Sequence, residues 1–286
     1  MNDRSISGTG EAGETNTVLE ARSITRHFGA VTALADASLA LHQNEVLGLV
    51  GDNGAGKSTL LKILSGVLPA DSGQIYLEGR EVRLRRPHDA LEAGIETVYQ
   101  DLALVDTMSA YQNVYLGREE LARPWPLRFL GLVDDGAMRK RSREVLDALA
   151  VKVPSINVSV KGMSGGQRQC LAIARAILWG RHIVILDEPT AALGVRESRQ
   201  VLDVIKDLRK HNVSVIVVSH NMQQMMEVAD RITVMRLGRT VATRVVAETS
   251  AEEIVGLITG AIGADVEEES RLVAPQTNTE GTGTTA

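Results

Sequence analysis

Short apolar segments alternate with polar stretches along most of this chain. Continuous apolar runs at Val46–Val50, Ile183–Leu186 and Val215–Val218 are typical of central parallel strands that are covered on both faces. The other segments with strand character are Val18–Ser23, Ala37–Leu41, Gln74–Leu77, Thr97–Tyr99, Ser214–Val218, Ile232–Met235 and Thr240–Arg244. Because helical patterns separate several of these segments, the sequence predicts an α/β fold.

The stretch from Asp101 to Gly180 has a mostly helical pattern, in which Asp134–Leu149 is amphipathic. Pro124 and Pro126 interrupt the chain ahead of that helix. A basic cluster on the helix favours a solvated face, with a partner contact as the alternative; it consists of Arg139, Lys140, Arg141 and Arg143. The pattern predicts a helical sub-domain at residues 101–179, inserted into an α/β core formed by 18–100 and 180–262.

Composition narrows the possible functions. The chain of 286 residues is 44% hydrophobic, enough to bury a core, and its 31 basic and 36 acidic residues give a net charge of −5. This balance argues against a general nucleic-acid binder. Cys170 is the single cysteine, so a disulfide framework is excluded and a reducing, cytosolic setting is expected. No apolar run approaches the roughly 20 residues of a membrane span. The polar ends, 1–17 and 263–286, are predicted to be disordered tails.

A glycine-rich segment follows the first apolar run and precedes a helical pattern at Lys57–Leu64. It matches the P-loop pattern G-x-x-x-x-G-K-[ST] and consists of Gly51, Asp52, Asn53, Gly54, Ala55, Gly56, Lys57, Ser58 and Thr59. Glycines let backbone N–H groups close around phosphate oxygens, and the helix N-terminus adds positive potential. We expect Lys57 to reach the β- and γ-phosphates of a nucleotide and the Ser58 hydroxyl to bind Mg²⁺.

Two adjacent carboxylates follow the apolar run Ile183–Leu186. Asp187 is expected to hold Mg²⁺, directly or through water, and Glu188 to polarise an attacking water. Adjacent carboxylates at the end of a buried strand repel each other, so a divalent cation between them is physically sensible. An acidic turn closed by Pro189 is the alternative. With the P-loop upstream, the pair predicts the second half of a P-loop NTPase site.

A second glycine-rich loop, Met163-Ser164-Gly165-Gly166-Gln167, opens the helical pattern Arg168–Trp179. Its free N–H groups and helix dipole favour an anion, although an ordinary helix start is the alternative when the loop is taken alone. The loop resembles the signature of ATP-binding cassette ATPases, with Met163 where leucine is usual. In that family the signature of one subunit, here Ser164, Gly165, Gly166 and Gln167, covers the γ-phosphate of ATP held by the other subunit. The resemblance therefore implies a head-to-tail dimer with two sandwiched ATP molecules.

The same resemblance implies roles for three further residues. Gln100 looks like the Q-loop glutamine, which touches Mg²⁺ or the water and links the core to the helical sub-domain. His220 resembles the switch histidine, which hydrogen-bonds the γ-phosphate and orients Glu188 and the water. Phe28 stands where the family carries an aromatic ring that stacks on adenine. The alternatives are a surface glutamine, a structural histidine and a phenylalanine packed in the core.

The resemblance covers roughly Val18–Gly260 and implies a P-loop NTPase core with a mixed sheet, an antiparallel β sub-domain and an inserted helical signature sub-domain. The chain departs from the family at Gly194, where aspartate usually follows leucine. This departure puts in doubt one cross-dimer contact near the water. It leaves the expected base, metal ligand and lysine in place, at Glu188, Asp187 and Lys57.

Within the family, the chain looks most like the single-cassette ATP-binding subunits of bacterial importers for simple sugars. The resemblance is carried by Gly51–Ser58, Tyr111–Glu119 and Ala191–Ser198. It implies ATP and Mg²⁺ as cofactors and no nucleic acid as a partner. It also implies a separate integral-membrane permease, a second copy of the ATPase subunit and, indirectly, a solute-binding protein. The implied location is peripheral, on the cytoplasmic face of the inner membrane.

The surface between Gln100 and Glu119 is expected to grip a cytoplasmic helix of the permease. Tyr111 and Tyr115 are its expected contact residues, and packing within the helical sub-domain is the alternative. Amino acids or another small solute are alternatives to a sugar. A cassette ATPase that acts on nucleic acid or ribosomes, and a module that binds ATP without hydrolysing it, are alternatives to transport; Glu188 and His220 argue against the latter.

Overall fold

The computed structural model describes residues 16–122, 131–180 and 182–263. Its strands are β1 (Thr17–Phe28), β2 (Val31–His42), β3 (Val46–Val50), β4 (Ser72–Leu77), β5 (Arg80–Val82), β6 (Ile95–Val98), β7 (Ile183–Asp187), β8 (Ser214–Val218), β9 (Arg231–Arg236) and β10 (Arg239–Val245). Its α-helices are α1 (Lys57–Leu64), α2 (Pro87–Glu92), α3 (Ala110–Tyr115), α5 (Asp135–Ala148), α6 (Gly165–Trp179), α7 (Val195–Leu208), α8 (Met222–Val228) and α9 (Ala251–Thr259). Most of the two predicted tails, and Pro124 and Pro126, lie outside the described residues; Thr17, assigned to the first tail, begins β1.

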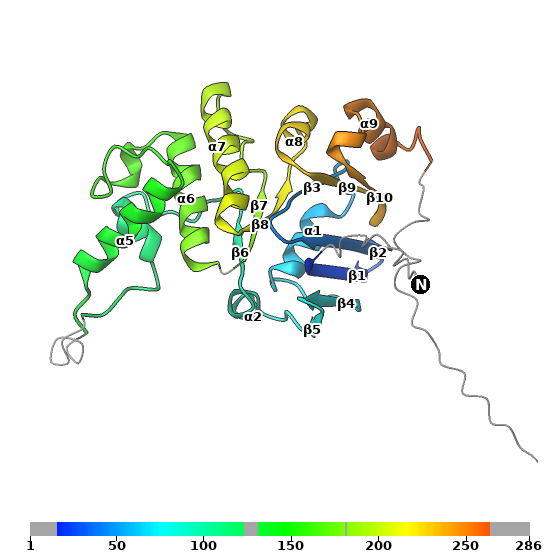
Figure 1. The fold of residues 1–286 in the computed structure, drawn as a ribbon. Helices are drawn as coiled ribbons and strands as arrows, with labels where there is room; N and C mark the ends of the chain where they lie inside the picture. Colours follow the sequence, from blue (N-terminus) through cyan, green and yellow to red (C-terminus); the bar gives the residue numbers. More distant parts are fainter. Residues whose placement is uncertain (1–15, 123–130, 181, 264–286) are drawn as a thin grey trace, which may run out of the picture.

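Two sheets form the framework of the molecule (Figure 1). The larger sheet has the strand order β10-β9-β3-β8-β7-β6, in which every neighbouring pair is parallel except β10 and β9. The smaller sheet has the order β2-β1-β4-β5 and is antiparallel throughout. The predicted α/β fold, with a mixed sheet and an antiparallel β sub-domain, is confirmed.

Helix α1 belongs to the hydrophobic cluster that joins the two sheets. Leu60 and Leu64 of α1 are fully buried with Leu47 of β3 and with Leu19 and Leu34 of the smaller sheet. A second cluster covers the other face of the larger sheet, where α6 and α7 pack. Since β3 and β8 are buried over their whole length between these clusters, their apolar runs are continuous rather than alternating. Parallel pairing places the carboxyl ends of β3, β8, β7 and β6 at one edge of the sheet.

Helices α3, α5 and α6 pack together at one side of the larger sheet (Figure 1). Tyr115 of α3 is fully buried and meets Trp179 edge to face, with ring centroids 5.3 Å apart. Tyr111 is also buried, and the Arg139 guanidinium lies 4.7 Å from the centre of its ring. The expectation that Tyr111 and Tyr115 present their rings to a permease is therefore wrong, because these rings build the helical sub-domain itself.

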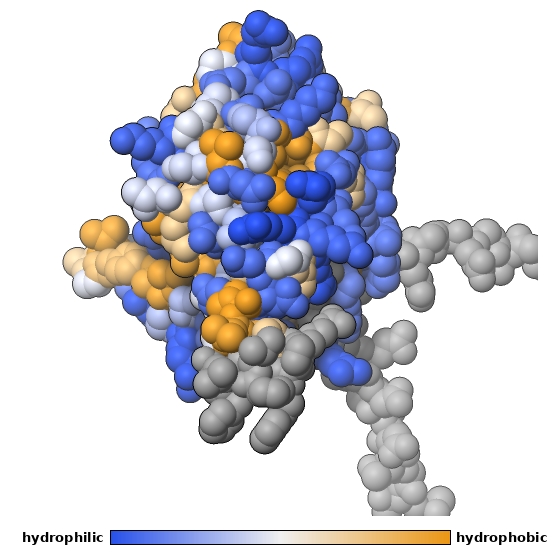
Figure 2. Space-filling model, turned by 90° about the vertical axis from the view of Figure 1, so that its left-hand side faces the viewer, coloured by the Kyte–Doolittle hydropathy of each residue, from blue (hydrophilic) through white to orange (hydrophobic). Residues whose placement is uncertain are grey.

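The surface of this helical side carries apolar patches among hydrophilic residues (Figure 2). In the described parts of the connection from α3 to α5, which leave out residues 123–130, the large exposed apolar side chains are Leu116, Leu121, Leu132 and Val133. Leu121 and Val133 face each other across an antiparallel β-bridge. Over the described residues, the helices are too short or too polar for any of them to cross a membrane.

Strand β1 extends further than its apolar pattern predicts. Instead of ending at Ser23, it continues to Phe28 past a shift in register with both β2 and β4. Ser23 has a positive φ of 50°, which is the local backbone irregularity at this shift. As a consequence, the last residues of β1 are Arg26, His27 and Phe28, which are therefore part of the strand and not of a loop.

Candidate functional site

The phosphate-binding loop joins β3 to α1. Gly51 has a φ of +151°, and a Cβ atom there would lie 2.2 Å from the Met235 carbonyl oxygen. Gly56 is the N-cap of α1 with a φ of +102°, and a Cβ atom there would lie 2.6 Å from Cδ2 of Leu34. Both positions therefore require glycine, which gives the sequence pattern its physical meaning.

The rest of the loop leaves backbone N–H groups available to an anion. Asp52, Asn53 and Gly54 are exposed, and Ala55 is buried with its N–H bonded to the Asp52 carbonyl oxygen at 3.1 Å. Helix α1, which is described over its whole length, has no side-chain cap and no acidic residue in its first turn. The first N–H groups of a helix have no partner within it, so those around the exposed Ser58 and half-buried Thr59 suit phosphate oxygens.

Lys57 is held at the mouth of the loop. Its ammonium group donates hydrogen bonds to the carbonyl oxygens of Gly51, at 2.6 Å, and Asp52, at 3.0 Å. Burial lowers the pKa of Lys57, while the nearby carboxylates Glu188, Asp52 and Asp187 act in the opposite direction. The lysine is thus already in place beside the loop that would receive the phosphates.

Glu188 and His220 come together where β7 and β8 end. His220 Nδ1 lies 2.9 Å from Oε2 of Glu188, and the Glu188 side chain is 19% exposed whereas that of His220 is 71% exposed. Glu188 has a positive φ of 49°, and its N–H donates to the Val218 carbonyl oxygen at 2.9 Å. A non-glycine residue in this conformation carries backbone strain, which clusters at functional positions. The contact places a basic imidazole on the carboxylate expected to act on water.

The surroundings of Asp187 disfavour its ionised carboxylate, which a bound cation would stabilise. Burial, and then the neighbouring Glu188 carboxylate, raise the pKa of Asp187, while Lys57 and Lys62 act in the opposite direction. Among the described residues, no group of three or more His, Cys, Asp or Glu side chains could bind a metal by itself. Asp187 and the Ser58 hydroxyl fit Mg²⁺, which characteristically completes its shell with water and phosphate oxygens.

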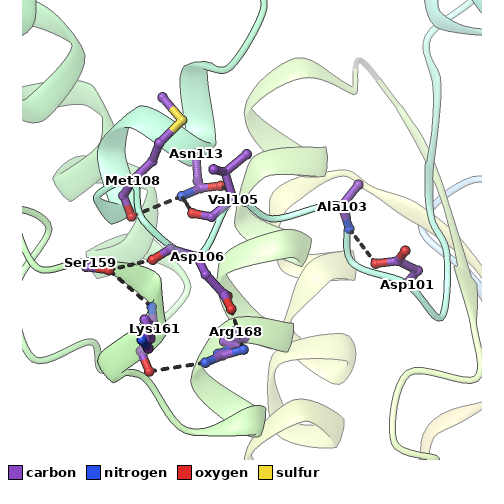
Figure 3. Close-up of polar contacts among 9 residues, drawn as sticks. All are labelled: Asp101, Ala103, Val105, Asp106, Met108, Asn113, Ser159, Lys161 and Arg168. Atoms are coloured by element: carbon purple, nitrogen blue, oxygen red, sulfur yellow. Dashed lines mark hydrogen bonds and ion pairs between the residues drawn. The ribbon is translucent and has the colours of Figure 1, made fainter.

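Gln100 is exposed and follows β6 at the same edge of the sheet, one strand away from Asp187. The loop that continues from it is fastened to α6 (Figure 3). Arg168 of α6 forms an ion pair with Asp106 at 3.3 Å, and Arg175 donates to the carbonyl oxygens of Leu102, at 2.8 Å, and Ala103. The predicted link between Gln100 and the helical sub-domain therefore has a physical basis in these contacts.

The second glycine-rich loop begins α6 through a reciprocal cap. The Ser164 hydroxyl accepts from the Gln167 N–H at 3.4 Å, and the Gln167 side chain accepts from the Ser164 N–H at 3.0 Å. A Cβ atom on Gly166 would lie 2.9 Å from Cβ of Glu197 in α7, so glycine lets the two helices start side by side. The contacts of this loop run to Lys152 and α7 rather than to the P-loop. Ser164, Gly165, Gly166 and Gln167 are thus not brought to the P-loop of the same chain.

Phe28 lies at the end of β1 and is 45% exposed, which excludes packing in the core. It pairs with Val31 of β2. Two residues further on, the Ala33 carbonyl oxygen lies 2.8 Å from where a Cβ atom of Gly56 would be. The strand that pairs with Phe28 therefore continues to the start of α1.

Sequence reasoning missed a cavity of about 450 Å³ beside the Glu188–His220 pair. Its lining includes Thr190, Leu193, Arg199, Asn221, Gln224 and Glu227. Thr190 donates to the Gln224 side chain at 2.5 Å, and Asn221 caps α8. Gly194, the departure noted above, is the N-cap of α7 at the edge of this region. Only the N-cap pattern before α8 was visible in the sequence; the cavity depends on how α7 and α8 pack.

Comparison with known proteins adds an independent line of evidence. The family model described as "ABC transporter" matches residues 34–191. The fructose import ATP-binding protein of Rhizobium meliloti is 44% identical over 85% of this chain and 94% of its own length. The xylose/arabinose import ATP-binding protein of Sulfolobus acidocaldarius is 42% identical with the same coverage. A ribose import ATP-binding protein of Rubrobacter xylanophilus is 40% identical over 88% of this chain but only 48% of its own length.

Solved structures show the same fold. An ATP-binding cassette of an ABC transporter in its ADP conformation superposes with a TM-score of 0.71 at 22% identity, covering 85% of this chain and 95% of that one. A bacterial ABC transporter cassette with a dimeric structure gives a TM-score of 0.66 at 23% identity, covering 80% of this chain and 98% of that one. At these identities the likeness bears on the fold alone.

Proposed function

Since the chain belongs to the ABC transporter family, we propose that it is the ATP-hydrolysing subunit of an importer for a simple sugar. The observation that carries the hydrolytic part is the 2.9 Å contact between His220 and Glu188, beside the half-buried Asp187 and Lys57. The sugar follows from the names of relatives that are 40–44% identical. Those names favour neither amino acids as the solute nor a role on nucleic acid or ribosomes.

In the proposed mechanism, the loop Gly51–Thr59 binds the phosphates of ATP through its N–H groups and Lys57. The Lys57 ammonium leaves the carbonyl oxygens of Gly51 and Asp52 for the β- and γ-phosphates, where it stabilises charge as the γ-phosphoryl group transfers. Ser58, Asp187 and Gln100 would hold Mg²⁺, which when bound neutralises charge on the phosphate oxygens. The exposed Phe28 ring stacks on adenine.

Glu188 then aligns the attacking water and takes its proton. His220 holds the Glu188 carboxylate through the contact at Nδ1, and its exposed ring is available to the γ-phosphate. Ser164, Gly165, Gly166 and Gln167 point to a different molecule as their partner, because their contacts within the chain avoid the P-loop. They act on the ATP of a second copy, so that closure of a head-to-tail dimer completes each site.

The partners proposed are an integral-membrane permease, a second copy of this chain and, through the permease, a solute-binding protein. The chain would work at the cytoplasmic face of the membrane. For the permease contact we propose, in place of the buried tyrosines, the exposed side chains Leu116, Leu121, Leu132 and Val133, which belong to the apolar surface of the described helical side. ATP binding and hydrolysis at the dimer interface would drive the permease by opening and closing the two subunits.

Purification of the tagged chain from membranes in mild detergent tests this function. We expect a polytopic permease to co-purify and ATP turnover to rise with one of fructose, xylose, arabinose or ribose when the solute-binding protein is present. A Lys57→Ala chain should retain the permease but lose the turnover. A chain without a membrane partner, whose turnover responds to nucleic acid or ribosomes, would contradict the transport function while leaving the ATPase site intact.

A further inference from the structure

Asp71, which precedes β4, bonds to two residues near the end of β1, Arg26 and His27. Its carboxylate accepts from the Arg26 guanidinium at 2.7 Å, from the His27 N–H at 2.7 Å and from His27 Nδ1 at 3.1 Å. Hydrogen bonds from His27 and the charge of Arg26 hold the pKa of Asp71 below its ordinary value. The Asp71 carboxylate is therefore ionised at neutral pH and fixes the position of the guanidinium.

Arg26 in turn lies over the ring of Phe28. The two residues are separated by one position at the end of β1, where the register with β2 shifts between Arg26 and His27. The central carbon of the guanidinium is 5.1 Å from the centre of the ring. The Arg26 side chain is 20% exposed, whereas Phe28 is 45% exposed. One side of the ring is covered by a fixed cation while the ring remains open to solvent elsewhere.

Strand β2 connects this arrangement with the phosphate-binding loop. Phe28 pairs with Val31, and the Ala33 carbonyl oxygen nearly touches Gly56 at the start of α1. We expect a planar base attached to phosphates at that helix start to meet the exposed part of the Phe28 ring. A free phenylalanine side chain on a strand end would sample several rotamers, and fixing it costs conformational entropy on binding.

We propose that Arg26 and Asp71 are positioning residues for the nucleotide base: Asp71 holds Arg26, and Arg26 holds the Phe28 ring in the orientation that stacks on adenine. This proposal rests on the proposed function, because it requires ATP at the P-loop. It assigns to Arg26 a role that acts through Phe28 and not through the phosphates. A purely structural role of Arg26, pinning β1 to β4, makes the opposite prediction for a ligand that lacks a base.

The test compares two ligands by titration calorimetry, Mg·ATP and the Mg²⁺ complex of inorganic tripolyphosphate. Arg26→Met keeps the length of the side chain and removes its charge, and Asp71→Asn releases the guanidinium. Each should raise the Kd for ATP about 2–5-fold, the effect of one exposed cation–π contact, and leave the Kd for tripolyphosphate unchanged. Phe28→Ala should raise the Kd for ATP about 5–150-fold, as expected for loss of one stacked base.

Arg22→Met is the matched control, since Arg22 lies on the same strand, pairs with Glu20 and stacks over Tyr76 at 4.3 Å. It should bind both ligands as the unaltered chain does. The Arg26→Met change should add nothing to Phe28→Ala, because the two residues act in series. Unchanged ATP binding by Arg26→Met, or equal weakening of both ligands, would overturn the positioning role alone. An unaltered chain that binds neither ligand would overturn the proposed function as well.

Discussion

Lys57, Glu188 and His220 follow three different strands, β3, β7 and β8, which are neighbours in the larger sheet. Each residue follows the carboxyl end of its strand, and parallel pairing brings the three strand ends to one edge of the sheet. At the scale of single residues, the site therefore depends on charge and hydrogen bonding over a few ångströms. Lys57 is the clearest case, because its ammonium group donates to the backbone carbonyl oxygens of Gly51 and Asp52, which it can release.

Replacement of Lys57 by alanine removes the cation that we assign to the γ-phosphate. We expect turnover of ATP, measured as phosphate release, to fall about 10²-fold or more, the loss typical of one preorganised charge-stabilising group. Lys210→Ala is the control, since its side chain is 72% exposed and pairs with Asp207 on the surface. Turnover by Lys57→Ala equal to that of the control would remove Lys57 from the mechanism.

Cys170 offers a second test at this scale, on the folded state rather than on catalysis. Burial in α6 raises the pKa of its thiol to about 12. The thiolate is the reactive form, so at pH 8 the folded chain should react with a thiol reagent about 10³-fold more slowly than the unfolded chain. Cys170 is the single cysteine, so the signal reports one site. Equal rates with and without guanidinium chloride would show that the thiol is not buried.

The raised pKa of the Cys170 thiol also makes the stability of the folded chain depend on pH in the alkaline range. Because the folded-state pKa of Cys170 lies above the ordinary value of 9.0, the unfolded chain loses this proton first as the pH rises. The contribution of the neutral thiol to stability is complete below about pH 9 and is lost progressively between about pH 9 and pH 12.

At the scale of elements, the loop from Asp101 to Met108 shows how a connection without regular structure is held in place. Asn113 of α3 is fully buried, and its side chain accepts from the Val105 N–H at 2.7 Å and donates to the carbonyl oxygens of Val105, Met108 and Ser109 (Figure 3). Ser159 donates to the Asp106 carbonyl oxygen from the other side at 2.5 Å. The segment between Gln100 and α3 is thus bonded to the helical sub-domain.

Asn113→Leu tests this anchoring. It removes the side-chain partner of the Val105 N–H and of the carbonyl oxygens of Met108 and Ser109, the last of these in a buried hydrogen bond, which should lower the free energy of unfolding by about 1–3 kcal/mol. Thermal unfolding followed by circular dichroism measures the change, and limited proteolysis should cut more readily between residues 101 and 108. The same substitution at the exposed Asn157 should have little effect. Identical melting of the two variants would contradict the anchoring role.

The pattern of apolar residues along the sequence predicted one helix and three strands of the core. Helix α1 spans the predicted range Lys57–Leu64, and the apolar runs became β3, β7 and β8. Strand β6 begins at Ile95 rather than Thr97, while β5 and α2 were not predicted. These last elements are short and partly exposed, so their sequences carry little periodicity.

Features that depend on contacts between distant residues were missed or wrong. Tyr111 and Tyr115 were expected at the surface, but α5 and α6 cover them. The network of Arg26 with Asp71 joins residues 45 positions apart and exists only because β1 pairs with β4. The assigned roles of the site residues, including Gln100, Phe28 and the signature residues, stay predictions until they are tested.

At the scale of the whole molecule, our proposal is that a second copy of the chain completes each site. The P-loop and the Glu188–His220 pair lie at the edge of the larger sheet, whereas Ser164 to Gln167 contact α7 and Lys152 instead of the P-loop. Two copies arranged head to tail would bring the signature loop of each to the nucleotide of the other. The central claim is therefore that ATP itself forms the dimer interface.

Light scattering on the Glu188→Gln chain, with saturating Mg·ATP, tests this claim most directly. The substitution keeps the size of the side chain and removes the base, so ATP should persist and the mass should rise to about twice that of the 30.8 kDa chain. The mass should remain that of one chain with ADP. It should also remain so with ATP when Gly165→Asp is added, although the double variant still binds ATP. A Glu188→Gln chain that binds ATP as a monomer, or a dimer indifferent to Gly165→Asp, would contradict the account.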